Sequence, residues 1–176
     1  MDTSFKRGLV KGAASVLLVA GVVATAPAIA HHSFALYNME QTLSFTGVVT
    51  RVNPDANHLQ IFFAPMNEER KNVERDADGK PLIWAVEMTG SAQAAADGIS
   101  VGSFPPGTIF SVGLHPLRSG EKAGSRVNPG AIYKCPEKKP PAAGKGCDSV
   151  EGHVTLGGGQ LPVQAGTTAP PATPAK

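Results

Sequence analysis

Four of the five histidines occupy positions from which they could bind a metal ion: His31, His32, His58 and His115. His31 and His32 follow a run of small and apolar residues in the stretch APAIAHHSF (26–34). If His31 were the first residue of a processed chain, its α-amine and ring Nδ1 would chelate one metal ion in a six-membered ring. One further imidazole would complete a T-shaped site of three nitrogens, the histidine brace, which suits tetragonal Cu(II). The histidines therefore raise the hypothesis of a divalent metal site, with copper ahead of zinc.

That hypothesis depends on a free amine at His31, and the start of the chain has the three-part plan of a secretory signal peptide. A basic head (residues 6–11) is followed by a short apolar core, AASVLLVAGVVA (13–24), and by the small residues AIA (28–30). A membrane-spanning helix needs about 20 predominantly apolar residues, and this core is nearer a dozen. We therefore predict a Sec-type signal peptide over residues 1–30 that is cleaved after Ala30. The processed chain would be bacterial, periplasmic or secreted, with no membrane span.

The charge of the remaining chain argues against a nucleic-acid partner. The whole sequence has a formal net charge of +2, and the predicted signal peptide carries all of it, through three bases and one acid (Lys6, Arg7, Lys11 and Asp2). Proteins that bind nucleic acid usually gather a basic excess on one face. Acidic and basic residues are instead mixed in EERKNVERDADGK (68–80), which we predict to be a solvated loop.

The elements that would position His58 and His115 are β-strands, because apolar residues in the middle of the chain alternate with polar ones. In 82–88, for example, Trp84, Val86 and Met88 share one face and Glu87 points away from it. A glycine at position 47 suggests a bulge or a bend in the first strand. The predicted strands cover residues 42–52, 58–63, 82–88, 108–115, 131–135 and 153–156.

One segment, SAQAAADG (91–98), is typical of a short helix, with Ser91 as the N-cap, good helix formers after it and Gly98 as the stop. Closure into a barrel hides the sheet edges of a small all-β domain. The fold class that we predict is therefore all-β: a small OB-like barrel of five to six strands with one short helix before the fourth strand. A small β-sandwich is the alternative.

The two cysteines, Cys135 and Cys147, would pair in an oxidising compartment. The loop between them is rich in Pro, Gly and Lys, and closing a loop of this length would contribute roughly 3 kcal/mol. We predict a structural disulfide rather than a redox or metal site. The single barrel domain would span residues 31–161, and the Pro/Ala/Thr-rich residues 162–176 would form a disordered tail.

His58 and His115 belong to predicted strands and point away from the Leu and Phe side chains, so three to four histidines could converge near one rim. Each also has a plainer interpretation, since His58 could donate to a loop carbonyl and His115 precedes a proline at a strand end. Hydrolytic catalysis has little support, because the chain lacks a Gly-x-Ser-x-Gly motif and Glu87 is the one carboxylate within a predicted strand.

The stretch HHSFALYNMEQTLSFTGVV (31–49) resembles the start of a family of short exported bacterial proteins of unknown function, whose processed chains begin His-His-Ser-Phe. Other matching pieces are Asn53-Pro54, Trp84 with Glu87, and GLHPLRSG (113–120), so the resemblance covers about residues 31–120. It implies a small exported β-barrel without an established activity. Three features depart from the pattern: DAN (55–57) separates Asn53-Pro54 from His58, the loop 68–80 is long, and the cysteine loop appears as an insertion.

Three functions from different classes follow from these observations. The first is a non-catalytic exported protein that binds copper or another divalent metal through His31, His32, His58 and His115. The second is a metal-independent interaction module that binds a protein of the cell envelope. The third is a copper-dependent oxidase.

Overall fold

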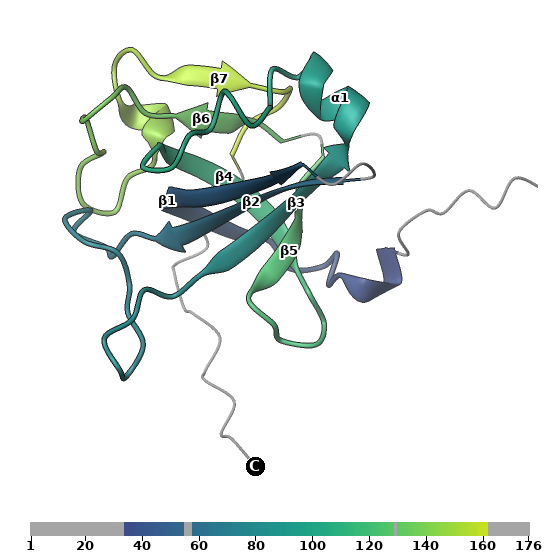
Figure 1. The fold of residues 1–176 in the computed structure, drawn as a ribbon, viewed down its shortest axis with the longest axis horizontal. Helices are drawn as coiled ribbons and strands as arrows, with labels where there is room; N and C mark the ends of the chain where they lie inside the picture. The colour runs from purple at the N-terminus through teal and green to yellow at the C-terminus, as the bar shows by residue number, and fades with distance from the viewer. Residues whose placement is uncertain (1–33, 55–57, 129, 162–176) are drawn as a thin grey trace, which may run out of the picture. The chain divides into compact units, whose positions relative to one another are not determined.

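The computed structural model describes residues 34–54, 58–128 and 130–161, and these contain the strands and helices labelled in Figure 1. The strands are β1 (Leu43–Pro54), β2 (His58–Pro65), β3 (Trp84–Gly90), β4 (Ile109–Pro116), β5 (Ala123–Arg126), β6 (Ile132–Lys134) and β7 (Val154–Leu156). One short α-helix, α1 (Ser91–Ala96), follows β3, and two 3₁₀ turns cover Phe34–Leu36 and Cys147–Ser149. The predicted histidine pair, His31 and His32, and the predicted tail 162–176 lie outside the described residues.

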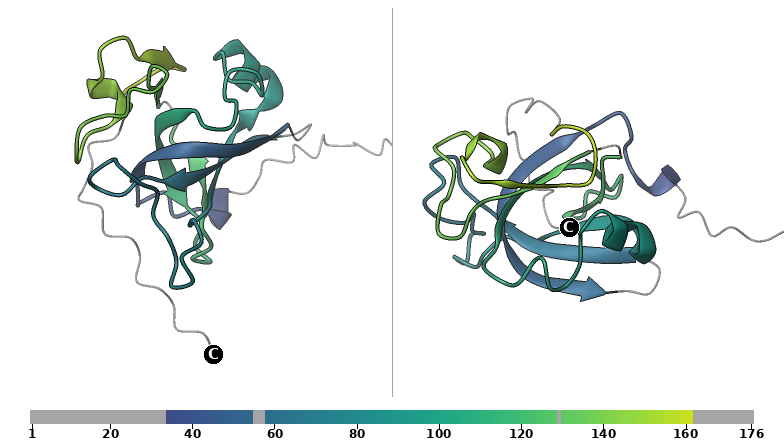
Figure 2. Two further views of the ribbon diagram at one scale, coloured as in Figure 1. Left: turned by 60° about the vertical axis from the view of Figure 1, so that its left-hand side comes forward. Right: turned by 90° about the horizontal axis from the view of Figure 1, so that it is seen from above.

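Five of the strands close into a barrel, as the all-β prediction required. Their order is β1-β2-β3-β5-β4, and β4 then pairs back with β1 through Leu43–Val48 and Ile109–Leu114. The right-hand view of Figure 2 shows the strands curving around a common centre. Closure leaves few unpaired strand edges in a small sheet, which is the physical advantage of this architecture over an open sandwich. The strands β6 and β7 extend the sheet beyond the barrel from β4.

The core fills the interior of the barrel with the alternate residues of each strand, as period-two patterning demands. Trp84, Val86 and Met88 of β3 are buried while Glu87 is not, which confirms the predicted facing of this strand. Four phenylalanines and Trp84 form a run of ring contacts through the core, with Phe63 touching Phe45 and Phe110, Phe110 touching Phe104, and Phe45 touching Trp84. Edge-to-face contacts of this kind stabilise the core beyond the area that they bury.

The strand β5 was not predicted, because AGSR has neither the apolar alternation nor the β-branched residues that mark strands. The glycine of this strand, Gly124, explains how β5 can pack closely against β4. A Cβ on Gly124 would collide with the backbone carbonyl of His115 and the side chain of Leu114, so β5 approaches β4 more closely than a larger residue would permit. The strand also pairs in parallel with β3 and so closes the barrel between two strands that are distant in sequence.

Two local predictions need correction. The irregularity in β1 falls between Val49 and Arg51 rather than at Gly47, whose Cβ would instead strike the Phe63 ring and the carbonyl of Ala64. Gly47 therefore permits close packing and does not make a bulge. In α1, Ser91 is the first helical residue, and the N-cap position is Gly90 with no side-chain cap.

The predicted disulfide is present between Cys135 and Cys147, with an S–S distance of 2.00 Å and a Cα–Cα distance of 4.9 Å. Both cysteines are buried. The backbone N–H of Cys147 donates to the Ser111 hydroxyl at 2.8 Å, and Ser111 shares a second hydrogen bond with Thr46 on β1. The disulfide thus fixes the inserted loop to the wall of the barrel.

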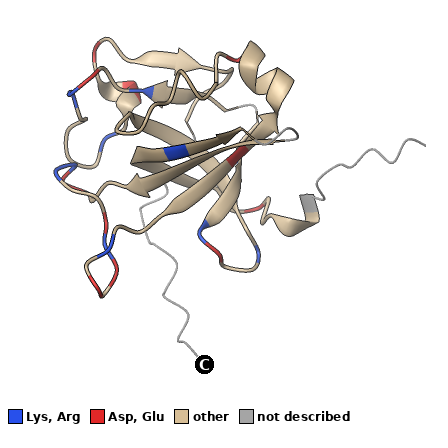
Figure 3. Cartoon of the chain, viewed as in Figure 1, with Lys and Arg blue, Asp and Glu red and all other residues tan. Residues whose placement is uncertain are grey.

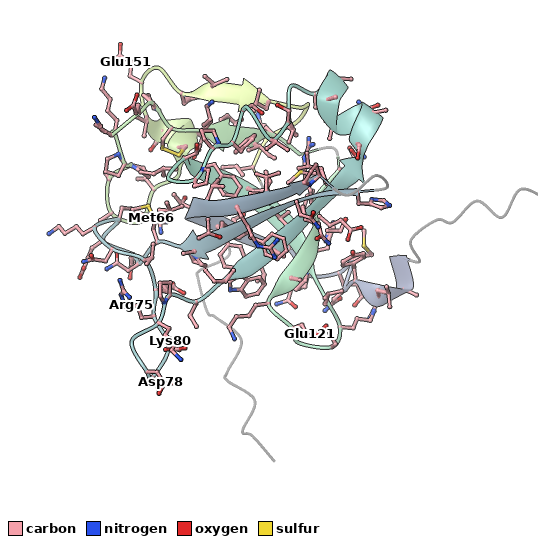
Figure 4. The ribbon with its side chains drawn as sticks, viewed as in Figure 1. Met66, Arg75, Asp78, Lys80, Glu121 and Glu151 are labelled. Atoms are coloured by element: carbon pink, nitrogen blue, oxygen red, sulfur yellow. A yellow bond between two sulfur atoms is a disulfide. The ribbon has the colours of Figure 1, made fainter. Side chains whose placement is uncertain are left out.

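The charged loop 68–80 is solvated over most of its length, but Arg70 departs from this prediction. Figure 3 shows that most charged residues lie in loops, and Figure 4 labels Arg75, Asp78 and Lys80 near the tip of this one. Arg70 is buried, and its guanidinium donates to the carbonyls of Met66, Asn67 and Lys145 at 2.9–3.1 Å. Because Lys145 belongs to the cysteine loop, Arg70 ties the two loops together.

Within the described residues, no helix is long and apolar enough to cross a membrane.

Candidate functional site

The first described residues of the chain pair with the residues at the end of β4. We call residues 34–42 the docked segment. The N–H of Asn38 donates to the carbonyl of Pro116 at 2.8 Å, and the N–H of Arg118 donates to the carbonyl of Leu36 at 2.9 Å. Tyr37 and Leu117 thereby form an isolated antiparallel bridge. The docked segment continues the barrel wall by a few residues at the end of β4.

Tyr37 fixes this segment to the neighbouring strands through its side chain. The residue is 7% exposed, and its hydroxyl hydrogen-bonds the carboxylate of Glu87 on β3. Burial, followed by the charge of Glu87 and this hydrogen bond, raises the pKa of Tyr37 to about 12 from its usual value near 10. The strand β5 lies between β4 and β3, and on this face its register places only the small residues Ala123 and Ser125.

Glu87 also contacts His58, the first residue of β2. The Nδ1 atom of His58 lies 3.4 Å from Glu87 Oε1 and 3.2 Å from the carbonyl oxygen of Met88. Both side chains are partly buried, at 23% and 16% exposure. The carboxylate of Glu87 therefore meets both an imidazole and a phenol on the outer face of the barrel, and we call His58, Glu87 and Tyr37 the outer-face triad.

A β-bulge places His58 in this position. His58 pairs with Gly90 and Gln60 pairs with Glu87, so three residues of β2 (58–60) lie opposite four of β3 (87–90) and one extra residue is inserted into β3. Bulges interrupt the ladder and re-aim side chains, and they are frequent beside functional sites. Here the bulge brings the carbonyl of Met88 toward the imidazole of His58.

Thr89, also on β3, has a buried hydroxyl without a hydrogen-bond partner in the described part of the chain. It follows Glu87 by two residues on β3 and shares its outward face. Among the described residues, its hydroxyl is the one buried side-chain oxygen or nitrogen without a hydrogen-bond partner. An orphaned buried hydroxyl is costly unless a water, an ion or a ligand completes it.

The structure does not bring His115 next to His58. In register, His115 pairs with Ser125 on β5, which pairs with Glu87 on β3, so two strands lie between His115 and the part of β2 that carries His58, about 14 Å of sheet at ~4.8 Å per strand. His115 Nδ1 donates to the carbonyl of Gln41 at 2.9 Å, which directs the ring toward the docked segment. His115 therefore supports the docked segment, and His58 is the histidine that meets a carboxylate.

Within residues 34–54, 58–128 and 130–161, no group of three or more His, Cys, Asp or Glu side chains is arranged to hold a metal ion. The predicted ligands His31 and His32 lie outside those ranges.

Sequence reasoning missed Tyr37 and Thr89 as members of the site. Tyr37 lies before the first predicted strand, where no periodicity indicates the direction of its side chain. Thr89 continues the outward positions of β3 after Glu87, so the alternation that placed Glu87 outside could have indicated it as well.

A second polar cluster, around Arg126, is structural. Arg126 is 5% exposed and donates to Asp97 Oδ2 at 3.0 Å and through Nε to the carbonyl of Gly130 at 2.9 Å. The hydrogen bond from Arg126, aided by Gln93, holds the pKa of Asp97 below its usual value. The cluster joins the end of α1 to the loop after β5 and has its hydrogen bonds satisfied internally.

Comparison with known proteins gives a family but no described relative. Residues 18–126 match the model of a family described as "Family of unknown function (DUF6152)". No curated protein and no solved structure matches the chain. The match covers β1 to β5 and with them the whole closed barrel and the outer-face triad.

Proposed function

We propose a metal-binding function for this chain, which belongs to the family of unknown function DUF6152. In this proposal the protein is exported, loses residues 1–30 and uses its new N-terminus to bind a divalent metal, copper ahead of zinc. The ligands are the α-amine and Nδ1 of His31 together with Nε2 of His58, and His32 offers a further imidazole. The role is non-catalytic.

The contact of Tyr37 with Glu87, beside His58, is the observation that carries the proposal. It anchors the docked segment to the face on which His58 lies. His31 precedes Tyr37 by six residues, and a chain of that length spans at most about 20 Å. The N-terminal amine of a chain processed after Ala30 is therefore tethered within reach of the outer-face triad.

The chemistry of the available donors suits copper. An amine and two imidazoles supply three neutral nitrogen ligands, and nitrogen sets of this kind favour the tetragonal geometry of Cu(II). The orphaned hydroxyl of Thr89 adds a polar group on the same face. His115 is left out of the ligand set, because its ring is directed to Gln41.

A single added residue tests the proposal. Two proteins are prepared, one that begins at His31 and one with a glycine before it, and each is titrated with Cu(II) in the presence of a competing chelator. The glycine displaces the amine from the chelate ring, and even the loss of an outer partner of a ligand weakens metal binding by about 10–100-fold. We expect the extended protein to bind at least about 100-fold more weakly.

Two further variants locate the third nitrogen. His58→Ala should weaken Cu(II) binding to the same extent, whereas His153→Ala should not, since His153 makes an edge-to-face contact with Tyr133 near the cysteine loop. Equal affinities of the His31-start and glycine-extended proteins would reject the amine as a ligand. N-terminal sequencing of the protein exported from its own leader, together with metal analysis, tests the location and the cleavage site.

A metal-independent interaction module is the second candidate, because Leu36 and Met39 of the docked segment are 56% and 42% exposed. Exposed apolar side chains on an anchored segment suit contact with another envelope protein. Recovery of a defined envelope partner that is the same with and without chelator, and is lost in Leu36→Ser, would favour this candidate over metal binding.

A further inference from the structure

We infer that Glu87 is a positioning residue of the metal site: it orients His58 through Nδ1, is itself held by Tyr37, and is not a ligand of the metal. The inference rests on the proposed function but concerns three described residues. It explains why a carboxylate lies on the outer face of β3 between an imidazole and a phenol.

The contacts of His58 determine which ring nitrogen could bind a metal. Both atoms near Nδ1, the Met88 carbonyl oxygen at 3.2 Å and Glu87 Oε1 at 3.4 Å, are hydrogen-bond acceptors. A neutral imidazole that faces acceptors at Nδ1 carries its proton there and has its lone pair on Nε2. The structure thus assigns Nε2 of His58 as the ligating nitrogen.

Of the two acceptors, only Glu87 carries charge. A carboxylate behind a ligating histidine fixes the direction of the ring and makes the imidazole a stronger donor to the metal. The Met88 carbonyl comes from the bulge and fixes the ring in the same sense without adding charge. Removing the charge of Glu87 alone should therefore weaken the imidazole as a donor to the metal, while the Met88 carbonyl still fixes the direction of the ring.

Tyr37 keeps the carboxylate of Glu87 beside His58, where it orients the imidazole and does not bind the metal. Its hydroxyl donates to Glu87, so the carboxylate receives donors from both the docked segment and β2. A carboxylate engaged on two sides is disfavoured as a metal ligand, because ligation would break hydrogen bonds that burial makes costly to lose. The same hydrogen bond brings the docked segment to the site.

The test compares Glu87→Gln with Glu40→Gln in proteins that begin at His31. Glu40 lies in the docked segment and is exposed, so its neutralisation removes the same charge from the same region without touching His58. Glutamine at position 87 retains an acceptor oxygen, and thermal unfolding checks that both variants are folded. Affinity for Cu(II) and the electron paramagnetic resonance spectrum of the copper protein are measured.

We expect Glu87→Gln to bind Cu(II) about 10–100-fold more weakly than the wild type, with shifted g∥ and A∥ values and all nitrogen couplings retained. Glu40→Gln should match the wild type in both measurements. Identical behaviour of the two variants would overturn the inference. A loss as large as that of His58→Ala with every nitrogen coupling retained would also overturn it, because Glu87 would then be a ligand.

Tyr37→Phe provides a second route if Glu87→Gln does not fold. It preserves the ring and removes the donor that holds the carboxylate, so we expect shifted g∥ and A∥ values with the nitrogen couplings intact. An unchanged spectrum in this variant would count against the holding role of Tyr37. The proposed function itself fails by a separate result, namely equal Cu(II) affinity of the wild type with and without the added glycine.

Discussion

At the scale of single residues, Tyr37 links the docked segment to the barrel. Its hydroxyl binds the carboxylate of Glu87 on β3, two strands beyond β4 in the barrel. One side chain thus gives direction to a segment that has little regular structure of its own. The exposed Leu36 and Met39 on either side of Tyr37 show that the segment is not held by general apolar burial.

The raised pKa of Tyr37, caused first by burial and then by Glu87, predicts a loss of stability at high pH. The pKa of Tyr37 is about 12 in the folded protein, above its usual value near 10. The folded state therefore holds the proton more tightly than the unfolded state, and the free energy of unfolding is unaffected below pH 10 and decreases as the pH rises from 10 to 12. Two pH units at about 1.4 kcal/mol each set the expected loss at roughly 2–3 kcal/mol.

Urea unfolding at pH 9 and pH 12 measures this loss, and Tyr37→Phe should reduce it by about that amount. Tyr133→Phe is the matched control, because it removes the other tyrosine hydroxyl of the chain and leaves Glu87 untouched. If the wild type and Tyr37→Phe lost stability in parallel over this range, the hydrogen bond to Glu87 would have no energetic role.

At the scale of elements, β5 is the strand on which closure depends. It joins β3 on one side and β4 on the other through only four residues. Gly124→Ala would place a methyl group against the carbonyl of His115 and the side chain of Leu114. We expect the variant to lose about 1–3 kcal/mol of unfolding free energy, the usual cost of overpacking.

Gly158→Ala is the control for this prediction, since a Cβ there meets nothing within 4 Å. Chemical denaturation of both variants gives the comparison. Equal stability of the two would mean that β5 can move away from β4 without loss, which the close pairing of Gly124 with Pro116 makes improbable.

The sequence predicted the elements whose side chains alternate and missed those that depend on the fold. Residues 58–63, 82–88 and 108–115 read as strands because one face of each is apolar, and this same patterning placed Glu87 outside. AGSR carries no such pattern, and its pairing arises only when β3 and β4 are already near each other. Arg70 was assigned to a solvated loop, because three backbone carbonyls from two loops cannot be seen in a run of charges.

For the candidate site, the sequence likewise indicated some of the residues but not how they are arranged. His58 and Glu87 were each identified, but as separate residues, because the bulge that brings them together depends on the pairing of β2 with β3. His115 was grouped with His58 on facing alone, and the strand order separates them. Facing specifies the side of a sheet, whereas distance across it depends on which strands are neighbours.

At the scale of the whole molecule, the disulfide adds stability to a barrel with a small core. It closes a loop of 12 residues, and Arg70 and the hydrogen bond from Gly144 to Glu68 attach that loop to the loop after β2. We expect the double variant Cys135→Ser, Cys147→Ser to lose about 2–4 kcal/mol in urea unfolding, an amount set by loop closure. A wild-type sample reduced and alkylated under denaturing conditions and then refolded should lose a similar amount, and no difference in either case would make the disulfide energetically neutral.

The parallel pairing of β3 with β5 has a consequence for the order of folding. The hairpins β1–β2 and β2–β3 connect neighbours along the chain, but the register of Ala85 with Ala123 forms only after α1 and the whole of β4 have been placed. Non-local pairing of this kind slows two-state folding to roughly milliseconds to seconds. Since the docked segment bonds Pro116 and Arg118 at the end of β4, the first of the described residues along the chain are expected to be the last to reach their native position.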